Sequence, residues 1–105
     1  MFFTLEDFQA KYPNIAVVPE GWQIEAVSQM ILSQVALTRR DDSWTAETVP
    51  SAIKNACLEQ MRFMIEQDIP FVDASKIKAG SMEAELHSEY STLALRYLAN
   101  AGYLY

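Results

Sequence analysis

The sequence is poor in the residues on which many functional sites depend. Among 105 residues it has one cysteine, one histidine and three glycines. Cys57 cannot form an intrachain disulfide, and with His87 alone neither a conventional zinc site nor a Cys/His hydrolase finds its full set of residues. Gly21, Gly80 and Gly102 lie far apart, whereas a phosphate-binding loop needs several neighbouring glycines. We therefore expect no catalytic residues, no bound metal and no cofactor.

Long hydrophobic runs and an excess of basic residues are also missing. No apolar run approaches the roughly 18 to 20 residues that span a bilayer. Glu6 and Asp7 stand where a signal peptide would carry a basic segment, which favours a cytoplasmic protein. Eight Lys and Arg against fourteen Asp and Glu give a net charge of −6. Because binding to nucleic acid gains its energy from basic side chains that displace counterions, this charge disfavours it.

Half of the residues are hydrophobic, and the chain, residues 1–105, has the length of one domain. Start and stop signals predict four helices. Thr4 is a predicted N-cap, Pro50 suits a first helical position, Pro70 disfavours continuation, and Gly102 is a predicted C-terminal stop. The predicted ranges are 5–12, 22–38, 50–68, and a last helix from about 88 or 91 to 101.

The third helix has an unusually wide apolar face. Its apolar positions recur every three or four residues, whereas polar side chains fall mostly on the opposite side. Phe63 and Ile65 widen this face beyond what a lone surface helix needs, so we expect contact on two sides, from a second core layer or from a partner subunit. The predicted core positions are Ile53, Ala56, Cys57, Gln60, Met61 and Met64; the predicted polar positions are Lys54, Glu59, Arg62 and Glu66.

The segment between residues 71 and 90 has a different pattern. Apolar and polar side chains alternate between residues 82 and 87, which is the period of a half-buried strand. The expected fold is therefore mainly α, a small bundle of about four helices with a short extended or β arm before the last helix. The glutamates of this segment and its surroundings, Glu83, Glu85 and Glu89, are expected to form a solvated face.

Several aromatic and apolar side chains are candidate interface residues. A terminus normally frays and is polar, so the uncharged tail of Tyr103, Leu104 and Tyr105 is expected to dock on its own core or on another chain. Trp22 and Trp44 either cap the core or anchor an interface. Between them, Arg39, Arg40, Asp41 and Asp42 predict a locally paired turn, with a contact to an acidic neighbouring subunit as the alternative. The other candidate interface residues are Phe63 and Met64.

The order of these elements resembles that of the phage head-tail connector (adaptor) family. The resemblance lies in LEDFQAKY, a second apolar helix, a polar turn, the Pro-initiated VPSAIKNACLEQMRFMIEQ, the segment IKAGSMEAELHSEY and the ending LANAGYLY. It covers nearly the whole chain and rests on pattern, because the family has no catalytic motif to match. Members often carry a glycine-containing strand before the last helix, whereas here Gly80 is followed by the helix-prone MEAEL.

The resemblance implies a structural subunit in the neck of the virion, made in the host cytoplasm. It implies a twelvefold ring of identical subunits whose partners are the portal protein and the tail or neck completion proteins, with no membrane contact. DNA would pass through the channel without specific binding. Acidic side chains suit such a wall, and the candidates to face the lumen are Glu59, Glu66, Glu83, Glu85 and Glu89.

A second hypothesis follows from the apolar faces alone. The chain is then a small helical protein-binding or regulatory domain, which holds one partner helix in a groove lined by Met61, Phe63, Met64 and Leu98. Such a domain would saturate one to one with a peptide, whereas a connector would form higher assemblies.

Overall fold

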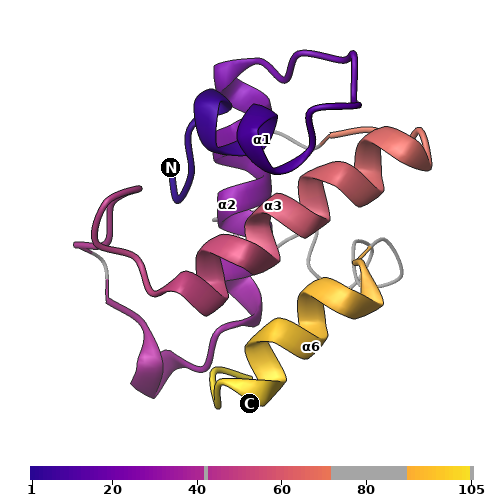
Figure 1. Cartoon of the computed structure of the whole chain (residues 1–105). Coiled ribbons are helices and arrows are strands. Elements are labelled where there is room, and N and C mark those ends of the chain that lie inside the picture. Colours follow the sequence, from indigo (N-terminus) through magenta and orange to yellow (C-terminus); the bar gives the residue numbers. More distant parts are fainter. Residues whose placement is uncertain (42, 72–89, 105) are drawn as a thin grey trace.

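The computed structural model describes residues 1–41, 43–71 and 90–104, and this part of the chain is mainly α, as predicted. The four α-helices are α1 (Leu5–Lys11), α2 (Gly21–Gln34), α3 (Ser51–Glu66) and α6 (Thr92–Asn100), with a short 3-10 turn, η1 (Leu37–Arg39), after α2 (Figure 1). The predicted extended arm at residues 82–87 lies outside the described residues.

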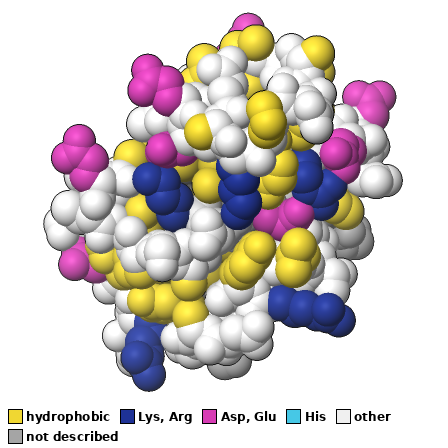
Figure 2. All heavy atoms as spheres, viewed as in Figure 1, with side chains coloured by type: hydrophobic (Ala, Val, Ile, Leu, Met, Phe, Trp, Pro, Cys, Tyr) yellow, Lys and Arg dark blue, Asp and Glu magenta, His cyan; other side chains and the backbone are white. Residues whose placement is uncertain are grey.

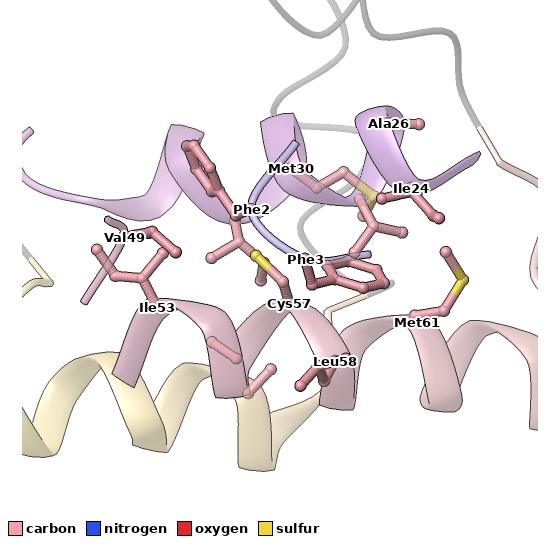
Figure 3. Packing of buried hydrophobic residues seen from close by; sticks show 14 of the residues in the cluster. Phe2, Phe3, Ile24, Ala26, Met30, Val49, Ile53, Cys57, Leu58 and Met61 are labelled. Carbon is pink, nitrogen blue, oxygen red and sulfur yellow. The ribbon is translucent and has the colours of Figure 1, made fainter. Parts of the chain in front are cut away.

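Helix α3 is the centre of the fold. It packs against α2 on one side and against α6 on the other, which accounts for its wide apolar face (Figure 1). The predicted two-sided contact is thus present, and two other helices of the same chain supply it. Ile53, Cys57 and Met61 of α3 face Met30 of α2 and the N-terminal segment (Figure 3).

The first three residues are part of the core, which the sequence patterns did not indicate. Phe2 and Phe3 are buried between α2 and α3 (Figure 3). The backbone N–H of Phe2 donates to Ser28 Oγ at 3.1 Å, and the amino terminus lies 2.9 Å from a carboxylate oxygen of Glu25. Ser28 in turn donates to the carbonyl of Ile24, so this buried hydroxyl has both a donor and an acceptor.

The predicted start of α1 is confirmed. Thr4 Oγ1 accepts from the backbone N–H of Asp7 at 3.1 Å, and the carboxylate of Asp7 accepts from the N–H of Thr4 at 2.9 Å. This reciprocal pair is a capping box, which satisfies two N–H groups at the helix start. At the other boundary, Pro50 is the N-cap of α3 and not its first helical residue, since the helix begins at Ser51.

Helix α2 ends at Gln34, four residues before the predicted end at Thr38. The prediction followed the apolar periodicity and missed the group that terminates the helix. Arg40 turns back, and its guanidinium donates to the carbonyls of Val35 and Ser33 at 2.8 and 3.1 Å. These carbonyls at the helix end have no partner within the helix, so a cation close by in sequence stabilises termination there.

Two residues with positive φ close the last two helices. Asp68 has φ of 53° after α3, and the N–H of Ile69 donates to the carbonyl of Met64. Gly102 has φ of 80° after α6, and the N–H of Tyr103 donates to the carbonyl of Leu98. The predicted glycine stop is confirmed, because a left-handed residue is what this C-terminal hydrogen bond requires.

Candidate interaction surfaces

Met64 was a predicted interface residue, and in the folded chain it is a core residue that also lines the floor of the groove described below. Its side chain is fully buried, as are those of Met61 and Leu98. The predicted groove for a partner helix is therefore filled by the packing of α3 against α6. Phe63 is only partly buried and packs against the edge of the core, so its candidacy as an interface residue stays a prediction.

Glu59 was predicted to lie on the polar face of the third helix, and it is buried instead, with 2% of its surface exposed. Both of its carboxylate oxygens accept from Arg62, at 2.5 Å from Nε and 2.6 Å from Nη2. A carboxylate enclosed in this way cannot line a channel. Arg62 also pairs with Glu66, whose side chain is about half exposed. Among the predicted lumen residues that the structure describes, only Glu66 remains available; Glu83, Glu85 and Glu89 lie outside the described residues.

The C-terminal tail docks on its own chain, which was one of the two predicted outcomes. The carbonyl of Tyr103 accepts from the backbone N–H of Ala36 at 2.7 Å. Its ring meets that of Trp44 edge to face, with centroids 6.3 Å apart, and Trp44 meets Phe2 in the same way at 6.2 Å. Trp44 thus joins the tail to the N-terminal segment and caps the core. Leu104 also packs against the core, and Tyr105 lies outside the described residues.

An open groove of about 490 Å³ lies at the start of α2 and the end of α3. The rings of Trp22 and Phe71 meet edge to face with centroids 6.2 Å apart. Trp22 is 49% exposed and Val17 is 55% exposed, although both are apolar. The groove is lined by Val17, Trp22, Gln23, Met64, Ile65, Asp68, Ile69, Pro70 and Phe71.

Sequence reasoning did not find this groove. Trp22 was a candidate interface anchor, and its exposure is compatible with that alternative. The other lining residues come from the loop before α2, from α2 itself, from the end of α3 and from the chain beyond it, and no periodic pattern links these segments. Only the tertiary fold brings these segments together.

A second exposed apolar feature is the η1 turn. Leu37 is 69% exposed, which is the largest value among the described large hydrophobic residues. The predicted local pairing of the two arginines with the following aspartates stays a prediction, because Asp42 lies outside the described residues. Arg40 caps α2, and Asp41 accepts from Ser43 at 2.8 Å. These hydrogen bonds from Ser43 lower the pKa of Asp41. Arg39 is exposed, and its guanidinium makes no ion pair with any described residue.

The face over α3 carries basic side chains that are mostly engaged. Figure 2 shows lysines and arginines across the middle of this face, with acidic side chains against some of them. Lys54 lies 3.1 Å from Asp7, and Lys11 approaches the rings of Tyr12 and Tyr97 at 5.8 and 5.6 Å from their centroids. Burial raises the pKa of Tyr12 to about 12, and the nearby Glu59 adds to this shift. The pair of Lys54 with Asp7 joins α3 to α1, and the contact of Lys11 with Tyr97 joins α1 to α6.

Groups that could carry chemistry are sparse in the described part of the chain. Burial raises the pKa of the Cys57 thiol well above its ordinary value, so this side chain behaves as a small packed hydrophobe, as predicted. No three His, Cys, Asp or Glu side chains among the described residues are placed to hold a metal ion. No described helix has the length and apolarity to cross a membrane.

Comparison of the chain with protein-family models, curated proteins and solved structures finds no match.

Proposed function

We propose that the protein is a structural subunit of the virion neck, a head-tail connector that forms a ring between the portal and the tail. The observation that supports this most directly is that two exposed apolar features lie far apart on the described surface, besides the single exposed residues Met1 and Leu93. One is the groove at Trp22, and the other is Leu37 on η1. A subunit of a closed ring needs two different surfaces, one for each neighbour.

The closed core strengthens this argument. The wide apolar face of α3 is covered by α2 and α6, and the C-terminal tail bonds to Ala36 of the same chain. Neither therefore needs a partner subunit. Among the apolar side chains that remain exposed, those of the groove and Leu37 are the ones that we expect association to bury. Solvent exposure of single apolar side chains is common, but grouping at a groove is typical of an interaction site.

Charge is the second support. With a net charge of −6, a ring of twelve such subunits would carry an acidic surface, and an acidic channel wall does not retain DNA. Among the residues that the structure describes, Glu66 is the candidate to line this wall, because it is exposed at the end of α3. The proposed role requires neither catalysis nor a cofactor, and its partners are further copies of the chain, the portal protein and the tail or neck completion proteins.

Light scattering after size exclusion, over a concentration series with and without a cognate portal ring, tests this proposal. A discrete ring, formed alone or only on the portal, is the expected result. A chain that stays monomeric and ignores the portal overturns it. Saturation by one partner peptide per chain would instead favour the protein-binding alternative, with the groove at Trp22 as its site, since the predicted groove at Met61 is closed.

A further inference from the structure

We propose that neighbouring subunits meet head to tail, with Leu37 of one copy seated in the groove between Trp22 and Phe71 of the next. Arg39 of the first copy then faces Asp68 of the second. This inference rests on the proposed function, because it names the contact by which the ring would form.

The groove has the chemistry that an aliphatic side chain with a neighbouring cation requires. Its walls are mainly apolar, from Val17, Trp22 and Phe71 among others. One carboxylate lies at its edge and a second lies next to it. Asp68 is a lining residue, is exposed, and makes no ion pair with any described residue. Glu20 is not itself a lining residue, but it accepts from Nε1 of the lining residue Trp22 at 2.5 Å, which places a second carboxylate next to the groove.

The η1 turn presents the complementary chemistry. Leu37 projects with 69% of its surface exposed, and Arg39 is exposed two residues later. The turn itself is held in place, because Arg40 bonds to the end of α2 and the N–H of Ala36 bonds to Tyr103. A rigid turn loses little conformational entropy when it docks, which favours binding. An exposed apolar residue beside a cation thus matches an apolar groove beside a carboxylate, and neither charge has an ion-pair partner among the described residues.

The two sites lie at opposite ends of α2. The groove includes Trp22 in the first turn of this helix, and Leu37 follows its last residue by three (Figure 1). A 14-residue helix is about 21 Å long, so one chain cannot fill its own groove with its own η1 turn. Two different complementary surfaces at opposite ends produce a heterologous contact, which closes into a ring when the rotation between copies allows it.

Cysteine pairing tests the direction of this contact, because Cys57 is buried and does not interfere. Thr38→Cys and Val18→Cys place thiols beside the two sites and leave Leu37 and Val17 intact; both positions are exposed. At high protein concentration under mild oxidation, the double variant should give a ladder of dimers, trimers and higher species. Each single variant should stay monomeric, because the head-to-tail contact brings residue 38 to residue 18 of the next copy and never to its own counterpart. The control, Thr38→Cys with Ala99→Cys at an exposed position of α6, should give no ladder.

A charge exchange tests the pairing of Arg39 with Asp68. Arg39→Asp and Asp68→Lys should each lower assembly at least tenfold, and the combined exchange should restore most of it. Leu37→Asp should abolish assembly. Arg96→Glu and Leu93→Asp, two exposed positions on α6, are the matched controls and should leave assembly unchanged. Thermal unfolding of each variant shows whether it folds, and Asp68→Asn removes the charge while suiting the positive φ at that position.

The outcomes separate this inference from the proposed function. Rings that form alone or on the portal, yet tolerate Leu37→Asp and give no ladder, overturn the contact and leave the connector role in place. Absence of any assembly under all of these conditions overturns both. A ladder together with rescue by the charge exchange supports both.

Discussion

Glu59 and Arg62 form a buried pair one turn apart on α3, with both carboxylate oxygens of Glu59 accepting from the guanidinium of Arg62. The carboxylate is almost completely buried, whereas about a quarter of the Arg62 side chain is exposed. The hydrogen bonds to Glu59 raise the pKa of Arg62. Burial of a charge is costly unless it is paired and hydrogen bonded, so the guanidinium is what allows a carboxylate at this core position.

Arg62→Ala should therefore destabilise the chain more than Glu59→Gln. Removal of Arg62 leaves a buried carboxylate without its counterion, which costs 3 to 5 kcal/mol in a fully buried pair and about 2 to 3 kcal/mol at this partly exposed site. Glu59→Gln removes the charge together with the need for pairing, at about 1 kcal/mol. Urea unfolding measures both values. Equal stability of the two variants would contradict the role assigned to this pair.

Gln60 is a second buried polar residue on α3, and its role is to begin α6. Its side-chain oxygen accepts from the buried backbone N–H of Ser91 at 2.7 Å. Gln60→Leu should destabilise the chain by about 1 to 3 kcal/mol, because the N–H of Ser91 loses its partner in a buried site. Ser91→Ala, which removes the N-cap bond to Ala94 and keeps Gln60, should cost about 1 kcal/mol. Urea unfolding of both variants in parallel checks this order.

The helices could be predicted because their signals are local. Thr4 and Asp7 lie three residues apart, and Gly102 directly follows the last helical turn. The residues that form the capping box and the glycine stop are therefore close together in the sequence. The end of α2 was missed because its terminating group, Arg40, belongs to a turn that was interpreted as solvated. Whether an arginine in such a turn stays solvated or bonds to the end of a helix depends on the path of the folded chain, which a local pattern does not show.

The burial of individual side chains was harder to predict than the helices. Glu59 has a charged side chain, and periodicity alone placed it on the polar face. In the fold it is buried, with both carboxylate oxygens bonded to Arg62, and periodicity does not show such a pair. Met64 fits an apolar face equally well in a core or in an interface, and sequence cannot separate these. The groove at Trp22 joins three segments without a shared periodic pattern, so no local signal points to it.

The C-terminal tail should contribute to the stability of the single chain. A chain that stops after Gly102 loses the ring of Tyr103 against Trp44 and the carbonyl that accepts from Ala36. We expect a loss of about 2 to 4 kcal/mol, since a large half-buried aromatic group is removed and a backbone donor loses its partner. Urea unfolding of the shortened monomer at low concentration measures this. Wild-type stability would indicate that the tail matters only for association.

The capping box of α1 should make stability depend on pH in the acid range. Partial burial of Asp7 opposes its ionisation, but hydrogen bonds from Thr4 and Lys54 outweigh this and lower its pKa below the ordinary 3.8. Because the folded pKa is the lower one, its contribution is complete above the unfolded pKa and is lost as pH falls through the folded pKa. Asp7→Asn should therefore be less stable than wild type by about 1 kcal/mol near neutral pH, with the gap closing in strong acid. Urea unfolding of both proteins between pH 2 and 7 measures the gap.

Asp41→Asn is a useful comparison, because Asp41 also has a lowered pKa but belongs to an exposed turn that fastens no helix. A gap for Asp7→Asn that stays constant down to pH 2 would show that the carboxylate charge has no part in holding α1.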